Sequence, residues 1–410
     1  MLSTRLAAVA VAVLVLPATG ARGWPLPAAP ACPVFPADNA WNQRVDALPT
    51  AANSAEVINS IGAGIGLHAD FGSGVWDGGP IGIPITVVDG QATPKYDVEF
   101  DYADESDPGP YPIPPDVAIE GGPSSSGDRH AIIVDREACR LYELYALYPR
   151  DGGWIAGSGA IWDLRSNALR PEGWTSADAA GLPILPGLAR YDEVARGVID
   201  HALRFTVERT RAAYVFPARH FASNLTDPNL PPMGLRLRLK ASFDTSGFPP
   251  QARVVLTALK RYGMMVADNG SNWFISGAPD PAWDNDDLRR LRDVKGSAFE
   301  VVDTSSIGPG PTGLTVTRLS ATRARFGIAV RWQTVSELGV LGYVVHRQAG
   351  SRFIAVSKVI VGKGTGRGGS YRFVDRPASV TSAHRYRLRI LHADGRRSWS
   401  ASAGVRAKRP

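Results

Sequence analysis

The densest group of reactive side chains in this sequence lies between residues 101 and 130. Its polar members are Asp101, Asp104, Glu105, Asp107, Glu120, Asp128, Arg129 and His130. Asp104, Glu105 and Asp107 are three carboxylates within four positions, so they repel one another, and partial burial would raise the pKa of at least one of them. A carboxyl group that keeps its proton beside an ionised carboxylate is the minimum equipment for glycoside hydrolysis.

We therefore predict a catalytic carboxylate pair drawn from Asp104, Glu105 and Glu120. The residues expected to tune its protonation are Asp128, His130 and His68. Two other interpretations of the acidic loop remain open. It could be an ordinary solvated loop, or it could bind calcium through carboxylate and carbonyl oxygens, although the spacing of an EF-hand is absent. No other cofactor is predicted.

A second set of residues is predicted to bind the substrate. It consists of His68, Asp70, Trp174, Asp178, His201, Asn272 and Trp273. His68 and Asp70 are two positions apart, so an extended strand places both side chains on one face. The indole rings of Trp174 and Trp273 offer flat apolar faces for a sugar ring. The alternatives are structural histidines and a hairpin turn at residues 268–273, because Asn-Gly between two apolar runs is a strong hairpin signal.

Several standard motifs are missing from the sequence, and their absence excludes whole classes of function. There is no G-x-S-x-G nucleophile elbow, no H-E-x-x-H, no P-loop and no G-x-G-x-x-G after a predicted strand. Two cysteines are too few for a zinc or iron–sulfur cluster. The sequence thus argues against a serine hydrolase, a zinc protease, a kinase or a dehydrogenase, and no metal site is predicted.

The first 20 residues have the pattern of a secretory signal peptide. One positive charge precedes a twelve-residue apolar run at 6–17, and small residues follow it. The run is shorter than a membrane span, so we predict a secreted, extracellular protein with no membrane span after signal cleavage. Cys32 and Cys139 are then predicted to form a disulfide, since free thiols outside the cell tend to oxidise. The alternative is two buried thiols.

Charge changes sign along the chain. Residues 311–410 contain 19 Lys and Arg against three acids, a net charge of +16, whereas the whole chain carries +6. The preceding residues are therefore acidic, and the asymmetry suggests two domains with different partners. We expect the basic part to hold the protein on an anionic envelope or matrix polymer through contacts that weaken with salt. No specific nucleic-acid site is predicted, because no base-reading motif is present.

The texture of the chain is β-rich. Short runs of β-branched and aromatic residues alternate with Gly, Pro and Asp, and helices are expected only at 53–61, 190–196 and 250–262. We predict a mainly β fold: a β-sandwich or jelly-roll-like large domain with a few short helices, and a seven-stranded sandwich after it. The predicted boundaries are a Pro/Ala linker at 21–36, an acidic β-rich domain at 37–304, a linker at 305–312 and a basic domain at 313–408.

Two parts of the chain resemble known families. Val-Arg-Trp-Gln-Thr around Trp332 and His-Arg-Tyr-Arg-Leu around Tyr386 resemble a fibronectin type III-like domain, whose members carry a core Trp early in the fold and a Tyr late in it. That resemblance implies an accessory or spacer module. The phrases DESDPGPYPIP, LRPEGWTSADAAGLPILPGL and ADNGSNW in the large domain are similar to a family of secreted bacterial proteins. This second resemblance implies export and carries no reaction with it.

These observations predict a secreted, glycan-active protein. The expected reaction is glycoside hydrolysis by a carboxylate pair, and the expected partner is a polysaccharide or another envelope or matrix glycan. The alternative is a non-catalytic carbohydrate-binding or adhesion protein of the cell surface or matrix. It would carry the same aromatic platforms, but it would need no carboxyl group with a shifted pKa.

Overall fold

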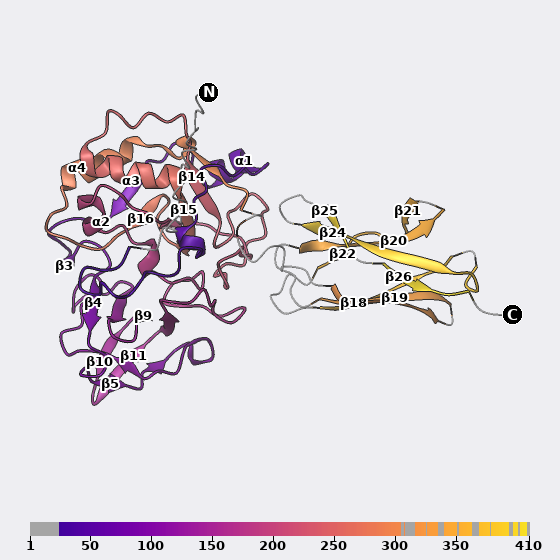
Figure 1. The fold of residues 1–410 in the computed structure, drawn as a ribbon, viewed down its shortest axis with the longest axis horizontal. Coiled ribbons are helices and arrows are strands. Elements are labelled where there is room, and N and C mark those ends of the chain that lie inside the picture. Colours follow the sequence, from indigo (N-terminus) through magenta and orange to yellow (C-terminus); the bar gives the residue numbers. More distant parts are fainter. Residues whose placement is uncertain are drawn as a thin grey trace, which may run out of the picture.

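The computed structural model describes residues 24–304, 307, 316–324, 326–334, 340–350, 352–362, 369–377, 379–392, 397–400 and 402–407. Figure 1 shows two bodies, which we call the larger body (residues 24–304) and the smaller body (residues 316–407). Strands hold 34% of the described residues and helices 13%, so the fold is mainly β with a few short helices, as predicted. The predicted signal peptide at 1–20 and most of the linker predicted at 305–312 lie outside the described residues. Within the described residues, every helix falls short of the length and apolar character that a bilayer span requires.

The larger body is organised around a six-stranded sheet in the order β1-β16-β13-β15-β14-β17. Its strands are β1 (His68–Asp70), β13 (Leu203–Val207), β14 (Arg236–Leu239), β15 (Met264–Asn269), β16 (Phe274–Ser276) and β17 (Phe299–Val301). The sheet is mixed, since β1 runs parallel to β16, and β13 runs parallel to β15 and antiparallel to β16. The hairpin predicted at residues 268–273 is therefore wrong. The turn is present, but β13 lies between its two arms, because an Asn-Gly signal specifies a local reversal and not the neighbouring strand.

Helices cover one face of this sheet (Figure 1). The α-helices of the described residues are α1 (Ser54–Ile61), α2 (Tyr191–Ala195), α3 (Pro250–Arg261) and α4 (Asn285–Arg289), of which the first three lie where helices are predicted. The 3-10 helices are η1 (Ala40–Asn42), η2 (Ala103–Glu105), η3 (Leu185–Gly187), η4 (Arg290–Asp293) and η5 (Gly296–Ala298). α3 begins at Pro250, whose missing N–H is tolerated at the first helical position. Its buried residues Val255 and Leu256 share a core with Leu203 and Phe205 of β13, so this face of the sheet is apolar.

A four-stranded sheet in the order β12-β9-β8-β4 makes up much of the rest of the larger body. Its strands are β4 (Ile85–Val88), β8 (Ala131–Asp135), β9 (Arg140–Tyr145) and β12 (Ser158–Asp163). Smaller ribbons pair β2 (Val75–Trp76) with β3 (Gly79–Pro80), β5 (Lys95–Tyr96) with β7 (Tyr111–Pro112), and β11 (Gly153–Ala156) with both β10 (Tyr148–Arg150) and β6 (Glu99–Phe100). The ribbons that contain β5, β10 and β11 extend the larger body away from the helical layer, whereas β3 lies near the helices (Figure 1).

The predicted disulfide between Cys32 and Cys139 is present. It ties the N-terminal segment to the four-stranded sheet, and Leu26, Val34 and Phe35 are buried in the core that surrounds it. Over its described residues, the segment predicted as a linker at 21–36 is thus a packed part of the body. Proline interrupts regular hydrogen bonding, but it does not prevent the apolar side chains between prolines from being buried.

The smaller body is a β-sandwich of two sheets, β18-β19-β23 and β21-β20-β24-β25, with β22 added beside β20 and β26 beside β24. Its strands are β18 (Val316–Ala324), β19 (Gly327–Thr334), β20 (Val340–Ala349), β21 (Arg352–Ala355), β22 (Ile360–Val361), β23 (Ser370–Asp375), β24 (His384–His392), β25 (Arg397–Trp399) and β26 (Ala403–Val405). Trp332, Tyr343 and Tyr386 fill its core. A sandwich is therefore present, with nine strands among the described residues where seven are predicted, while membership of the fibronectin type III-like family stays a prediction.

Candidate active site

Ionisable side chains and one serine that are far apart in the sequence meet inside the larger body, and we call them the Arg204 cluster. The cluster consists of Asp70, Glu120, His130, Glu143, Asp178, Arg204, Asp268 and Ser276. Arg204 lies between two core residues of β13, so the alternation of a strand turns it to the face opposite the helices. Asp70 of β1, Ser276 of β16 and Asp268 of β15 lie on neighbouring strands of the same sheet.

The other members of the Arg204 cluster come from the four-stranded sheet and the loops around it. Glu143 lies in β9, His130 directly precedes β8, and Glu120 lies in the loop before that strand. Asp178 belongs to the segment 174–184 between β12 and η3. The cluster therefore joins the two main sheets of the larger body.

Arg204 is the buried centre of the cluster. Its Nε and Nη2 each donate to one carboxylate oxygen of Asp178 at 3.1 Å, and its Nη1 donates to Ser276 Oγ at 2.6 Å. Asp268 Oδ2 lies 4.0 Å from Nη2. Burial alone would lower the pKa of Arg204, but the charges of Asp178 and Asp268 outweigh burial and raise it, so the guanidinium keeps its charge.

Asp178 and Asp268 form a pair of carboxyl groups with one arginine between them. Burial and the nearby charge of Asp178 raise the pKa of Asp268 to about 7. Burial also raises the pKa of Asp178, although the ion pair with Arg204 opposes this. Since one arginine compensates only one negative charge, Asp268 holds a proton close to neutral pH.

His130 and Glu120 form a second ion pair beside the first. The ring Nδ1 of His130 lies 2.5 Å from Glu120 Oε2, and its Nε2 lies 3.0 Å from the carbonyl oxygen of Ala177. Both ring nitrogens thus face oxygen acceptors, as a protonated imidazole requires. Burial lowers the pKa of His130, but the carboxylate of Glu120 outweighs burial and raises it to about 9. Burial likewise raises the pKa of Glu120, yet the charge of His130 holds it below its ordinary value.

Part of the cluster is open to solvent. The side chains of Glu120 and Asp268 are 26% and 24% exposed, and Asp70 is exposed at the end of β1. Nearby protein atoms desolvate the carboxyl of Asp70, and these atoms together with the charge of Glu120 raise its pKa. His130, Asp178 and Arg204 are buried. Three reachable carboxyl groups therefore lie above a buried layer of paired charges.

Glu143 is the deepest acid of the cluster. It is fully buried and accepts hydrogen bonds from the backbone N–H groups of Ile184 and Leu185, at 2.9 Å. Burial raises its pKa to about 7, against the opposing effect of these hydrogen bonds and of His130. Its contacts hold the start of η3, so its role is to position the segment that carries Asp178.

An open hollow of about 640 Å³ lies at the end of β15, and none of the three carboxyl groups lines it. It is lined by Ile65, Glu208, Asn269, Gly270, Ser271, Asn272 and Phe274. Asn269 directly follows Asp268, and the ring of Phe274 stacks on His68 at 4.0 Å between centroids. Tyr145 is a further aromatic neighbour, because its ring lies 5.8 Å from that of His130. The hollow thus begins one residue after Asp268, and the aromatic rings of Phe274 and Tyr145 lie beside His68 and His130.

The structure brings four of the predicted site residues together: Asp70, Glu120, His130 and Asp178. Asp104 lies apart from them, exposed in η2. Glu105 belongs to another network, since its carboxylate accepts from the backbone N–H of Thr175 at 2.9 Å. Of the three acids from which the catalytic pair is predicted, Glu120 thus lies in the cluster, whereas Asp104 and Glu105 lie on a short surface turn outside it. Asp128 is exposed, and its charge adds to the raised pKa of His130.

The remaining residues predicted to bind the substrate lie in different environments, and only some of them are partly exposed to solvent. Trp273 is fully buried in the core, and its indole N–H donates to the carbonyl oxygen of Gly62, so it offers no platform to a sugar. His201 is buried and lies 3.0 Å from Glu193, which makes it a structural residue. Trp174 is half-buried beside the guanidinium of Arg170. Asn272 lines the hollow, but its side chain accepts from the backbone N–H of Glu208.

Sequence reasoning missed Arg204, Glu143 and Asp268. Asp268 begins the Asp-Asn-Gly motif, where it is interpreted as a turn residue. Arg204 lies in a strand of otherwise apolar and β-branched residues, and a charged residue in such a strand needs a buried partner. That signal points to a buried ion pair, but it does not identify Asp178 as the partner.

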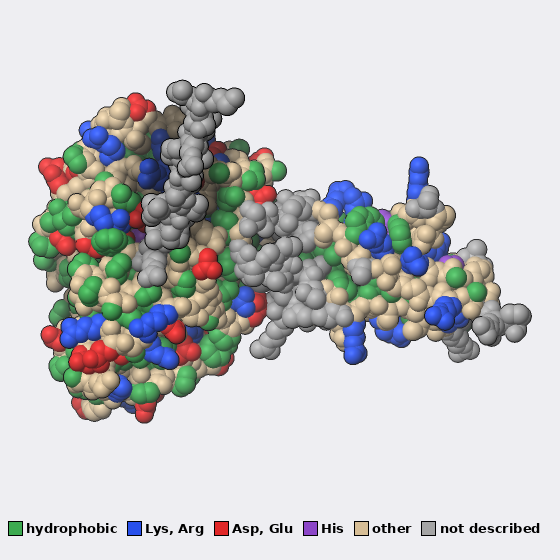
Figure 2. Space-filling view, in the orientation of Figure 1, with side chains coloured by type: hydrophobic (Ala, Val, Ile, Leu, Met, Phe, Trp, Pro, Cys, Tyr) green, Lys and Arg blue, Asp and Glu red, His purple; other side chains and the backbone are tan. Residues whose placement is uncertain are grey.

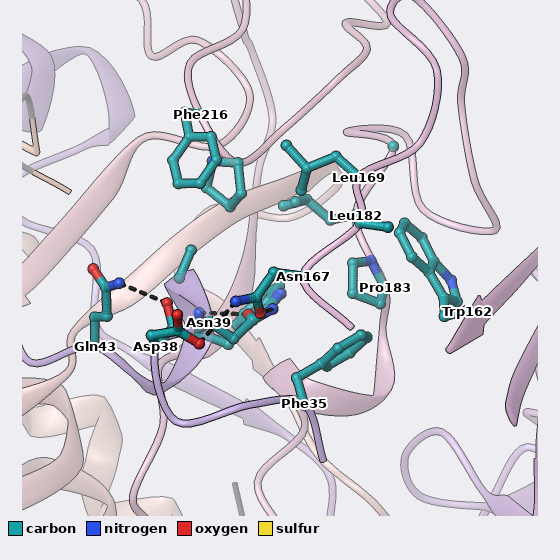
Figure 3. Close-up of a pocket in the computed structure, with 15 residues that line it drawn as sticks. Phe35, Asp38, Asn39, Gln43, Trp162, Asn167, Leu169, Leu182, Pro183 and Phe216 are labelled. Atoms are coloured by element: carbon teal, nitrogen blue, oxygen red, sulfur yellow. Dashed lines mark hydrogen bonds between the residues drawn. The ribbon is translucent and has the colours of Figure 1, made fainter. Parts of the chain in front are cut away.

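A second, better enclosed pocket of about 410 Å³ lies elsewhere in the larger body. Figure 3 shows apolar side chains, among them Phe35, Leu182 and Phe216, around a polar edge where Asn167 accepts a hydrogen bond from Asn39 and donates one to Asp38. None of the residues that line it belongs to the Arg204 cluster. We place the chemistry at the cluster, because shifted pKa values and converging charges mark an acid–base site better than enclosure does.

Among the described residues, no group of three or more His, Cys, Asp or Glu side chains is arranged to hold a metal ion. Comparisons of the chain with protein-family models, with curated proteins and with solved structures gave no significant match. The family resemblances therefore stay predictions, and a function must rest on the chemistry of the Arg204 cluster.

Proposed function

We propose that the larger body is a glycan hydrolase that uses Asp268 as general acid and Glu120 as general base. The proposal rests on one observation. Glu120 and Asp268 are both partly exposed and both lie near the buried Arg204 and His130, yet the pKa of Glu120 is lowered and the pKa of Asp268 is raised. Opposite shifts in adjoining carboxyl groups are how enzymes keep one acid protonated and the other ionised at one pH.

The proposed reaction is a direct hydrolysis. Asp268 holds its proton near neutral pH and gives it to the glycosidic oxygen as the bond from that oxygen to the anomeric carbon breaks. Glu120 is ionised and takes a proton from the water whose oxygen forms the new bond to that carbon. Proton exchange with solvent then restores both carboxyl groups, so one water is consumed and no net proton.

The surrounding residues position this pair. Arg204 holds Asp178 beside Asp268, and the charge of Asp178 is one cause of the raised pKa of Asp268. His130 holds Glu120 in place and favours its ionised form. Arg204 and His130 are therefore positioning residues in this proposal.

An exposed aromatic side chain near Glu120 supports a glycan as substrate. Trp76 is 77% exposed in the β2–β3 ribbon. That ribbon packs tightly on the loop after Glu120, since a Cβ added to Gly79 would lie 2.0 Å from the carbonyl carbon of Gly121. An exposed indole on the ribbon that packs against this loop suits the apolar face of a sugar ring.

We also propose that the protein works outside the cytoplasm. The Cys32–Cys139 disulfide supports this compartment, because disulfides persist where the environment is oxidising. The predicted signal peptide would deliver the chain there.

The test measures turnover on a panel of neutral and acidic polysaccharides through the reducing ends that hydrolysis releases. Asp268→Asn and Glu120→Gln should each lower kcat by about 10²–10⁴-fold, the usual contribution of a general acid or base. Asp104→Asn is the matched control, because it changes an exposed acid outside the cluster and should leave turnover unchanged. Activity of the natural chain should fall as the pH rises through about 7, where Asp268 loses its proton. Full activity of Asp268→Asn would refute the assignment.

The second candidate is a non-catalytic carbohydrate-binding protein. It is favoured by the pairing of Arg204 with Asp178 and of His130 with Glu120, since paired buried charges also occur in purely structural networks. If the natural chain binds a polysaccharide of the panel but releases no reducing ends, and Trp76→Ala weakens that binding, this candidate replaces the hydrolase.

A further inference from the structure

The smaller body presents arginine and aromatic side chains together on the outer face of one sheet. In β24, Tyr386 and Leu388 are core residues, so the alternating Arg387 and Arg389 point outward. Arg389 is the cross-strand partner of Trp399 in β25. This places Trp399 on the same outer face as the two arginines.

Trp399 is the centre of this group and is 43% exposed. The guanidinium carbons of Arg387 and Arg389 lie 5.6 and 5.7 Å from its ring centroid. Phe353 of β21 lies beside it, with ring centroids 6.4 Å apart, and Arg387 also lies 5.3 Å from the ring of Phe353. We call Phe353, Arg387, Arg389 and Trp399 the Trp399 patch.

The arginines of the Trp399 patch lack acidic partners within the described residues. Asp375 is the one acid there in the smaller body, and it already binds Arg347 and the hydroxyl of Tyr386. Arg387 Nε donates weakly to the carbonyl oxygen of Ser400 at 3.3 Å, and Arg389 Nε is buried without a hydrogen-bond partner. Figure 2 shows blue basic side chains over the smaller body, while red acidic side chains are seen on the larger body. The patch therefore carries positive charge that the described part of this body does not neutralise.

We infer that the Trp399 patch binds an acidic polysaccharide, with the face of one uronic acid ring on Trp399 and the carboxylates of that ring and of a neighbouring ring on Arg387 and Arg389. The indole supplies an apolar platform, and guanidinium groups are the side chains best suited to carboxylates. Charge complementarity thus selects the occupant. The basic composition of residues 311–410, at +16, adds long-range attraction for the same polymer.

A polysaccharide fits this face better than a nucleic acid does. Single-stranded nucleic acids are bound by rows of aromatic rings on which successive bases stack. Phe353 and Trp399 instead lie side by side with their ring planes tilted by 50°, so they do not form a row of parallel stacking surfaces. The choice of a polysaccharide also rests on the proposed function of the larger body, which would act on the polymer that the smaller body holds.

The test measures binding of the full chain to polygalacturonate, a polymer of uronic acid, by affinity electrophoresis. Arg387→Gln/Arg389→Gln should weaken binding about tenfold, and Trp399→Ala should weaken it by a similar factor. The matched control is Arg331→Gln/Arg372→Gln, a cross-strand pair on the other sheet that removes the same charge. It should change binding less than threefold. Trp399→Phe should keep most of the affinity.

Three results would overturn the inference. Equal losses in the two double variants would show attraction without a site. Tighter binding of single-stranded DNA than of polygalacturonate, with the same dependence on Trp399, would assign the patch to nucleic acid. Unchanged polygalacturonate binding in Trp399→Ala would show that Trp399 does not contact the sugar ring. Because Asp268→Asn should leave polygalacturonate binding intact, failure of the hydrolase proposal and failure of this one give different results.

Discussion

The two bodies of the chain treat charge in opposite ways. In the larger body, Arg204 and His130 are buried, and each is paired with a carboxylate. In the smaller body, Arg387 and Arg389 lie on an outer face without an acid among the described residues. Burial removes water from an ion and makes a partner necessary, whereas an ion at the surface remains solvated. The buried charges of Arg204 and His130 therefore help to hold the larger body together, whereas the charges of Arg387 and Arg389 in the smaller body are free to bind a ligand.

Of the changes proposed here, removal of Arg204 should lower the free energy of unfolding the most. Arg204→Ala leaves the buried carboxylate of Asp178 without its partner, so the free energy of unfolding of the larger body should fall by about 3–5 kcal/mol. Urea denaturation followed by fluorescence measures the change. Arg387→Ala is the control in the smaller body and should change stability by less than about 0.5 kcal/mol. Similar losses in the two variants would mean that the bodies do not differ in this respect.

The pair of His130 and Glu120 predicts a dependence of stability on pH in the larger body. Because the pKa of His130 is raised to about 9, the folded chain binds this proton more tightly than the unfolded chain does. The resulting stability is complete below about pH 6.5 and disappears as the pH rises through about 9, a change on the order of 3 kcal/mol. Denaturation between pH 6 and 10 tests this, and His130→Gln should flatten the curve in that range.

The acids Asp268 and Glu143 predict a second pH range, below that of His130, in which the stability of the larger body changes. The raised pKa values of Asp268 and Glu143, about 7 each, also favour the protonated folded state, so their contribution is lost as the pH rises from about 4 to 7. The same titration, extended to pH 4, should show this earlier decline. Asp268→Asn should reduce the decline in this window and leave the window above pH 7 unchanged, and a uniform shift of the whole curve would contradict the separation.

The smallest expected effect concerns the one described acid of the smaller body. Tyr386→Phe removes the hydrogen bond that the hydroxyl donates to Asp375 at 2.9 Å, while Arg347 remains to pair with that carboxylate. The smaller body should lose about 1 kcal/mol of stability. Hydrogen–deuterium exchange of peptides that cover residues 384–392 measures it. A loss as large as that of Arg204→Ala would place a buried ionic centre in the smaller body as well.

Local patterns predicted elements better than they predicted the site. The helix α3 has Pro250 at its start and apolar residues at helical spacing, and both signals act within a few residues. The core positions of Trp332 and Tyr386 were instead implied by the resemblance to a fibronectin type III-like domain, and both side chains are buried. Glu120 and His130 were recognised as reactive residues ten positions apart, but their partner Arg204 lies more than seventy residues further along the chain.

The sequence by itself determined the mainly β class, the positions of three helices and the pairing of the two cysteines, because each depends on residue spacing or on simple counting. Only the tertiary structure decided which acids meet. β13 inserts between β15 and β16 and brings Arg204 beside Asp268 and Ser276, while the loop around Asp104 stays at the surface. The physical reason is that desolvation and charge pairing depend on distance in space, which strand order sets and local sequence does not encode.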